Sequence, residues 1–156
     1  MKEIERKFLV NKDLLPSLNK SDGQQISQGY LINTKDLTLR IRTTNKKGFI
    51  TLKGKTEGIS REEYEYEIPR HEADAIMTNN ITQKIEKRRH EVFYKNKKWE
   101  VDFFSGNLKG LIIAEVELYS EKEDIEIPLW CDTEVSENQK YYNSELIKLN
   151  SIKDLF

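Results

Sequence analysis

The chain has little cysteine, little proline and no long apolar segment, and each shortage excludes a class of protein. Its single cysteine, Cys131, cannot form an internal disulfide, which excludes a disulfide-stapled scaffold and favours a reducing compartment. Beside Trp130, we interpret Cys131 as a packing residue rather than a nucleophile. Residues 1–10 carry charges throughout, which excludes a signal peptide, and no segment has the roughly 20 apolar residues of a membrane helix. We therefore expect a cytoplasmic protein that has no membrane partner.

The length and the charge of the chain further limit the classes of protein to which it can belong. No segment rich in proline, glycine or serine marks a linker and no repeat is present, so residues 1–156 are predicted to form one domain. Charged residues make up 34% of the chain, yet the 26 basic residues nearly balance the 27 acidic residues. This balance removes the general electrostatic argument for a nucleic-acid-binding surface, and we expect no nucleic acid partner.

Alternation with a period of two residues runs through most of the chain and indicates β-strands. Short turn signals such as Asp22-Gly23 separate the segments, and short connections favour antiparallel neighbours. The predicted strands cover residues 2–9, 24–33, 37–44, 49–55, 61–69, 82–94, 99–105 and 111–120. Short helices are predicted at residues 11–19 and 71–78, and a C-terminal helix at 143–155 because its apolar residues form one stripe.

One face of these strands carries formal charges almost exclusively, and the charges are sorted by sign. In segment 61–69, for example, Glu63 and Glu65 share a face. Carboxylate pairs with this spacing also occur in segments 2–9 and 111–120, whereas segments 37–44, 49–55 and 82–94 carry basic pairs. Segment 24–33 is the exception, because Gln28 and Tyr30 take the positions of the charges.

Two interpretations of this face compete. A solvent-facing sheet with cross-strand salt bridges is the ordinary one, and each such bridge contributes little stability. A ladder of salt bridges would, however, mix the two signs along each strand, since like charges repel. Patches sorted by sign instead suit a ligand that has a cationic part and an anionic part. Carboxylates bind hard divalent cations, and Arg and Lys bind the phosphoryl oxygens that those cations bridge.

The apolar face of eight strands must also be buried, and the chain has few helices to cover it. Closure of the sheet solves this problem and removes the sheet edges. The predicted fold is therefore mainly β (α+β): a closed eight-stranded antiparallel β-barrel, with charges lining the lumen, a few short helices outside and a C-terminal helix.

The opening residues Glu3-Ile4-Glu5-Arg6-Lys7 resemble the ExExK signature of the CYTH superfamily, the triphosphate tunnel metalloenzymes. Further segments follow in an order that is similar to the family's and that spans most of the chain. They are Gln28-Gly29-Tyr30, Leu39-Arg40-Ile41-Arg42, Thr51-Leu52-Lys53, Ser60-Arg61-Glu62-Glu63-Tyr64-Glu65, Glu86-Lys87-Arg88-Arg89, Asp102-Phe103-Phe104-Ser105-Gly106 and Glu115-Val116-Glu117.

The resemblance implies a set of site residues. The metal ligands would be Glu3, Glu5, Asp102, Glu115 and Glu117, holding two Mg²⁺ or Mn²⁺ ions. The substrate would be bound by Lys7, Arg40, Arg42, Lys53, Arg61, Lys87, Arg89 and Lys140. Direct catalytic roles fall to Lys7, Glu63, Glu65 and Lys87. His71 and His90 are interpreted as surface or strand-end residues rather than as bases.

The resemblance also implies an activity, which is the metal-dependent hydrolysis of a triphosphate. Because the chain is similar to compact bacterial members and has no insertion that would supply a nucleoside pocket, inorganic tripolyphosphate is the expected substrate, with pyrophosphate and phosphate as products. A class IV adenylate cyclase, a thiamine triphosphatase and a non-catalytic polyphosphate-binding module remain alternatives. The expected partner is a small molecule that contains a triphosphate, and the oligomeric state, including a homodimer, stays open.

Overall fold

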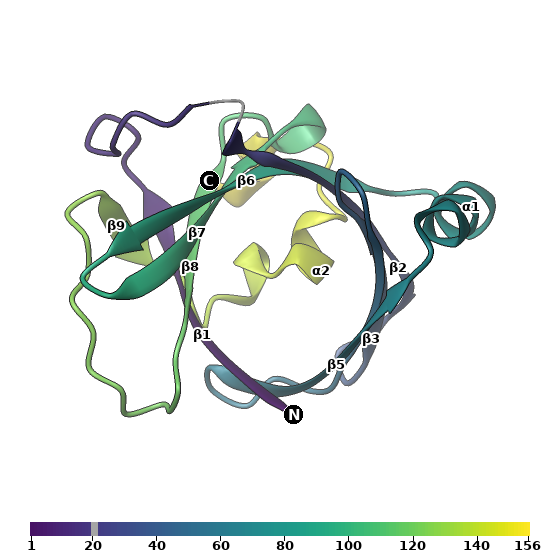
Figure 1. Ribbon diagram of the computed structural model, residues 1–156, viewed down its shortest axis with the longest axis horizontal. Coiled ribbons are helices and arrows are strands. Elements are labelled where there is room, and N and C mark those ends of the chain that lie inside the picture. The colour runs from purple at the N-terminus through teal and green to yellow at the C-terminus, as the bar shows by residue number, and fades with distance from the viewer. Residues whose placement is uncertain (20–21) are drawn as a thin grey trace.

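The strands of the computed structural model, which describes residues 1–19 and 22–156, close into a ring (Figure 1). Around the ring the order is β1-β5-β4-β3-β2-β6-β7-β8 and back to β1, and every neighbouring pair is antiparallel. The strands are β1 (Lys2–Val10), β2 (Gln24–Asn33), β3 (Thr38–Thr43), β4 (Gly48–Lys53), β5 (Ser60–Ile68), β6 (Ile85–Tyr94), β7 (Lys97–Phe104), β8 (Ile112–Glu117) and β9 (Cys131–Glu134). The predicted closed eight-stranded antiparallel barrel is confirmed, with one extra strand.

The extra strand, β9, was missing from the sequence prediction. Strand β1 pairs with β5 only through Lys2, Glu3 and Ile4, which leaves the later part of the same edge unpaired by the barrel. Strand β9 covers this part by pairing with Phe8 and Val10. An exposed strand edge presents free N–H and C=O groups, so a short segment without apolar alternation can pair with it. The ion pair of Glu134 with Arg6 and the packing of Cys131 in the outer core also hold β9 there.

Two apolar layers cover the outside of the barrel. Helix α1 (Arg70–Asn80), close to its predicted bounds, packs Ala73 and Met77 against Ile41 of β3. On the other side, Trp130 packs edge-on against Trp99, with ring centroids 5.6 Å apart. Trp130 therefore belongs to the outer core and does not cap the lumen. Burial raises the pKa of the neighbouring Cys131 thiol to about 12, which agrees with a packing role.

The C-terminal segment differs from the prediction of one helix at 143–155. It forms the 3₁₀ helix η3 (Gln139–Tyr141), the four-residue helix α2 (Asn143–Leu146) and the 3₁₀ helix η4 (Ile152–Leu155). Figure 1 shows α2 inside the ring, whereas the prediction placed helices outside it. Leu146 and Ile147 pack there against inward-facing Phe104 and Ile113. The segment therefore forms several short helices that fit the barrel end, in place of one long helix with a single apolar stripe.

Two smaller findings complete the fold. Residues 11–19, predicted as a short helix, form only turns, in which the N–H groups of Leu14 and Leu15 donate to the carbonyls of Asn11 and Lys12. A further 3₁₀ helix, η2 (Gly106–Leu108), precedes β8. Within the described residues, no helix is both long and apolar enough to cross a membrane.

Candidate active site

The inward faces of the barrel strands divide the lumen into an acidic half and a basic half. Neighbouring strands β7, β8, β1 and β5 supply most of the carboxylates, and β4, β3 and β6 supply most of the cations, with β2 between β3 and β6. The split follows from strand geometry, because residues two apart share a face and the sequence sorts its charges by strand. A cavity of about 240 Å³ lies between the halves, lined by Glu3, Glu5, Arg40, Arg42, Lys53, Glu63, Glu65, Arg89, Glu100, Glu115, Glu117 and Asn143.

The charged lining ends where the strands reach the C-terminal segment. At that end the inward positions of the barrel are apolar, as at Leu9, Ile85 and Ile113, and they pack against the α2 region. The charged part of the lumen is therefore closed on one side by an apolar core. This core also brings Asn143 of α2 to the cavity wall.

The carboxylates of the acidic half are crowded. Glu5 lies directly opposite Glu117 across the β1–β8 pair, and its nearest cation is the Lys7 ammonium at 4.0 Å. Burial, together with the charges of Glu115 and Glu3, raises the pKa of Glu5 to about 7. Burial and Glu3 likewise raise the pKa of Glu63, although the charge of Lys53 opposes them. The acidic half thus lacks positive charge where Glu5 and Glu63 lie.

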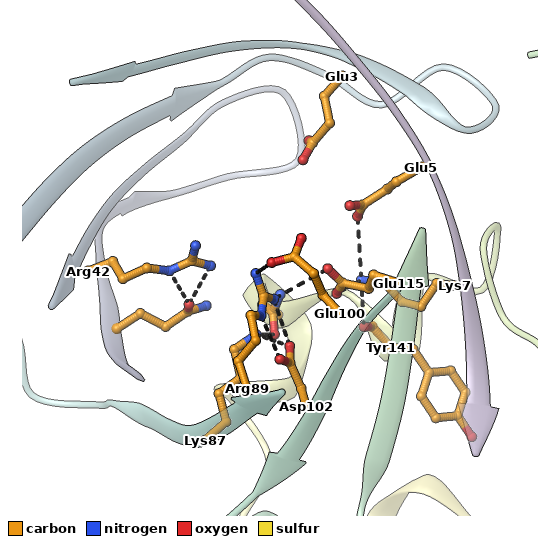
Figure 2. Close-up of polar contacts among 12 residues, drawn as sticks. Glu3, Glu5, Lys7, Arg42, Lys87, Arg89, Glu100, Asp102, Glu115 and Tyr141 are labelled. Atoms are coloured by element: carbon orange, nitrogen blue, oxygen red, sulfur yellow. Dashed lines mark hydrogen bonds and ion pairs between the residues drawn. The ribbon is translucent and has the colours of Figure 1, made fainter. Parts of the chain in front are cut away.

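Two lysines of the lumen, Lys53 and Lys7, partly neutralise these carboxylates. Lys53 Nζ lies 2.9 Å from Glu3 Oε2, and Lys7 Nζ lies 3.4 Å from Glu115 Oε1. Burial would raise the pKa of both acids, but the attraction of their lysines outweighs it and lowers the pKa of Glu3 and of Glu115. Lys7 also donates to the Tyr141 carbonyl at 3.4 Å (Figure 2). Both carboxylates are therefore held ionised.

A buried cluster joins the two halves at the β6–β7 boundary. Asp102 is fully buried, with Oδ2 2.6 Å from Lys87 Nζ and Oδ1 2.7 Å from Arg89 Nε (Figure 2). Arg89 also contacts Glu100 at 2.8 Å. Burial, reinforced by Arg89 and Arg42, lowers the pKa of Lys87 to about 8. Because Lys87 has no exposed side-chain surface, it does not touch the cavity as the structure stands.

The basic half contains nitrogen donors that lack acceptors. Four buried side-chain nitrogens in the described part of the chain have no hydrogen-bond partner, and three belong to lumen residues: Gln28 Nε2, Arg40 Nε and Arg61 Nε. Buried polar groups are normally paired, so unpaired donors on three side chains of the lumen face indicate a missing acceptor. An anion with several oxygens would satisfy them.

The acidic half offers only oxygen donors, which suits Mg²⁺ or Mn²⁺ better than softer ions. Among residues 1–19 and 22–156, however, no three acidic, histidine or cysteine side chains are arranged to hold an ion as they stand. Lys53 and Lys7 pair with Glu3 and Glu115 instead. The raised pKa of Glu5 shows that more positive charge would be favourable here. The donor set therefore fits a hard divalent cation, provided that the two lysines move toward another anion.

Most of the residues predicted from sequence meet at this cavity. Lys140 does not: it is exposed on η3, where its backbone N–H donates to Asn138 Oδ1 at 3.2 Å. Asp102 reaches the cavity wall only through Arg89. Sequence reasoning missed Glu100 and Thr51, although each shares a strand face with a predicted residue, and the period-two rule would have found them. It could not find Asn143, which only the tertiary fold brings to the lumen.

Comparisons with known proteins agree with this arrangement. A family model described as the CYTH domain matches residues 1–150. A protein of Acetivibrio thermocellus named inorganic triphosphatase is 45% identical over 149 residues, which cover 94% of this chain and 94% of that one. A protein of Nitrosomonas europaea with the same name is 34% identical over 154 residues, covering 94% of this chain and 97% of that one. The crystal structure of the inorganic triphosphatase NE1496 is similar with a TM-score of 0.66 and 32% identity, covering 93% of each chain. The family model spans nearly the whole chain and the relatives match along almost their full length, so this chain belongs to the CYTH domain family.

Proposed function

We propose that the protein is a divalent-metal-dependent triphosphatase that hydrolyses inorganic tripolyphosphate to pyrophosphate and phosphate inside the barrel. The observation that carries the proposal is the division of one cavity into a carboxylate wall and a cationic wall, in a lumen whose basic half contains unpaired donors. Two relatives that match most of this chain are named inorganic triphosphatase, which supports the same activity.

The carboxylate wall would hold the metal. Glu3, Glu5, Glu115 and Glu117 are the proposed ligands, for two Mg²⁺ or Mn²⁺ ions. A bound divalent cation supplies charge at the phosphoryl oxygens and lowers the pKa of a bound water. Glu63 and Glu65 would orient that water, and Thr51 Oγ1 holds Glu65 in place at 2.8 Å.

The cationic wall would bind the triphosphate. Arg40, Arg42, Arg61 and Arg89 present guanidinium groups, whose planar N–H groups match phosphoryl oxygens. Lys53 and Lys7, which pair with Glu3 and Glu115 here, would exchange these carboxylates for phosphoryl oxygens of the substrate. Such fixed cations stabilise charge on the transferring and leaving groups, which is the main task in phosphoryl transfer.

Two predicted roles take a different form in the proposal. Both oxygens of Asp102 are engaged by Lys87 and Arg89, so we assign Asp102 to orienting Arg89 rather than to metal. Lys87 would add positive potential behind Arg89 without contacting substrate. A role for Lys140 in substrate binding remains a prediction. We also propose a cytoplasmic location, which the single free Cys131 supports.

Phosphate release from tripolyphosphate, ATP and thiamine triphosphate, measured with Mg²⁺ and Mn²⁺ and after chelation, tests this function. A cyclic AMP assay runs alongside it. We expect metal-dependent release of phosphate with tripolyphosphate preferred, and loss of activity in Glu3→Gln and Glu117→Gln with folding retained. Cyclic AMP as the main product would overturn the hydrolase assignment, and tight binding without turnover under either metal would indicate a binding module.

A further inference from the structure

Arg42 is anchored differently from most cations of the lumen. Lys7, Arg40, Lys53, Lys87 and Arg89 each form an ion pair with a carboxylate. In the described part of the chain, Arg42 forms none. Instead its Nε and Nη2 both donate to Gln28 Oε1, at 3.0 and 2.8 Å. Gln28 on β2 and Arg42 on β3 lie directly opposite each other in the register.

The orientation of the Gln28 amide follows from the chemistry of its partner. An arginine side chain has only donors, so the amide oxygen must face it and the amide nitrogen must point elsewhere. Gln28 is fully buried, and this nitrogen, Nε2, has no partner. An isolated buried N–H donor costs free energy unless an acceptor arrives.

No carboxylate of the described residues lies within ion-pair distance of Arg42, although Asp102 and Glu65 act on its charge from further away. Figure 2 shows its guanidinium reaching into the lumen from the side opposite Glu5. Burial, together with repulsion from Arg40 and Arg89, lowers the pKa of Arg42 to about 9, which marks a position that gains from an anion. A neutral amide fixes the guanidinium in place without neutralising it, whereas a carboxylate at the same position would do both.

We propose that Gln28 is a positioning and specificity-determining residue that aims an unneutralised Arg42 at a phosphoryl group and donates a second hydrogen bond from Nε2 to the same group. The inference rests on the proposed function, because it assumes that the lumen binds a triphosphate. It extends that function by assigning a role in substrate binding to Gln28, a neutral residue of the cationic wall.

Gln28→Glu is the decisive variant, because it keeps the side-chain shape and adds a carboxylate beside Arg42. We expect the KM for tripolyphosphate to rise about 10- to 100-fold, as for a lost charged hydrogen bond, with a much smaller change in kcat. The Tm should stay equal or increase, because the new carboxylate pairs with a buried guanidinium. A residue that served only folding would not give a higher KM together with an unreduced Tm.

Gln25→Glu is the matched control. Gln25 lies on the same strand but is exposed on the outer face, so the substitution adds the same charge outside the lumen. Its KM should stay within about twofold of wild type, as for an exposed substitution. Equal KM values for Gln28→Glu and wild type, or equal increases in Gln28→Glu and Gln25→Glu, would overturn the inference.

A double-mutant cycle covers the case in which Gln28→Glu folds poorly. Gln28→Met removes both polar atoms at similar volume, and its effect on tripolyphosphate affinity should largely vanish in an Arg42→Ala background. Fully additive effects would refute the coupling. If wild-type protein neither binds nor hydrolyses tripolyphosphate, the proposed function itself fails. If wild type is active and Gln28→Glu has the same KM, only the proposed role of Gln28 is refuted.

Discussion

Asp102→Asn is the substitution whose consequence the structure defines most sharply. It preserves shape while removing the one negative charge that faces both Lys87, at 2.6 Å, and Arg89, at 2.7 Å. Lys87 keeps a weak contact to Asn143 Oδ1 at 3.5 Å and its position 5.3 Å from the centroid of the Phe104 ring. Arg89 keeps Glu100 at 2.8 Å and Glu115 at 3.5 Å. Among the described residues, the Lys87 ammonium would thus lose its only ion-pair partner, and the Arg89 guanidinium would lose one of three.

Removing one partner of a buried ion pair typically destabilises a protein by about 3–5 kcal/mol. The remaining contacts of Arg89 with Glu100 and Glu115 favour the lower part of this range. For a chain of this length, each kcal/mol corresponds to about 2–4 °C in Tm, so we expect Tm to fall by roughly 6–20 °C.

The loss of stability in Asp102→Asn should also depend on pH, because Lys87 no longer carries an unpaired buried charge once it loses its proton. Its pKa is already lowered to about 8, and loss of Asp102 lowers it further. A lowered lysine pKa means that the charged form destabilises the fold, fully so below the folded pKa and less as pH rises above it. The difference in unfolding free energy between wild type and Asp102→Asn should therefore shrink as pH rises toward about 8, the folded pKa of Lys87 in wild type, and should level off above it.

Urea unfolding of wild type and variant at these pH values measures the effect. Glu134→Gln is the control, because Glu134 accepts two hydrogen bonds from Arg6, both at 2.8 Å, but at the surface. We expect that change to destabilise by less than about 1 kcal/mol. A similarly small effect of Asp102→Asn, or one independent of pH, would refute the reasoning that the buried carboxylate holds these cations in place.

Three further predictions concern the lumen. In metal-free protein, the raised pKa of Glu5, about 7, means that the folded state holds a proton that the unfolded state releases, so stability should fall as pH rises toward neutrality and recover with Mg²⁺. Thermal melts with and without Mg²⁺ test this, and an unchanged pH profile in Glu5→Gln would contradict it. Arg42→Ala should raise the KM for tripolyphosphate more than it lowers kcat, and steady-state kinetics showing an unchanged KM would count against phosphate binding there. Leu146→Ala, at a fully buried position of the barrel end, should cost about 2–5 kcal/mol in urea unfolding, against about 0.5 kcal/mol or less for exposed Leu129→Ala.

Some features of the fold follow from local sequence because strand geometry is local. Successive side chains point to opposite faces, so the alternation in β5 places Arg61, Glu63 and Glu65 on one face whatever the strand pairs with. The sign of the charges on each strand is likewise set by the sequence of that strand. The strands and the sorting of their charges could be predicted for this reason, whereas closure into a barrel was inferred from the apolar face that has to be buried and the roles of the site residues from the family resemblance.

Contacts between distant segments were decided only by the tertiary structure. The pairing of Lys53 with Glu3, the engagement of Asp102 by Lys87 and Arg89, and the anchoring of Arg42 by Gln28 each depend on which strands become neighbours and in which register. A one-residue change of register would turn every such side chain to the other face.

The C-terminal segment shows the same limit most clearly. Its apolar residues suit a helical stripe, yet burial of Leu146 and Ile147 against the inward faces of β7 and β8 is worth more than continuing one helix. Its four-residue helix therefore lies within the ring and closes the barrel end. The sequence by itself determined which side chains face the lumen; packing and strand pairing across the closed barrel decided which of them meet, because those forces act between residues far apart in the chain.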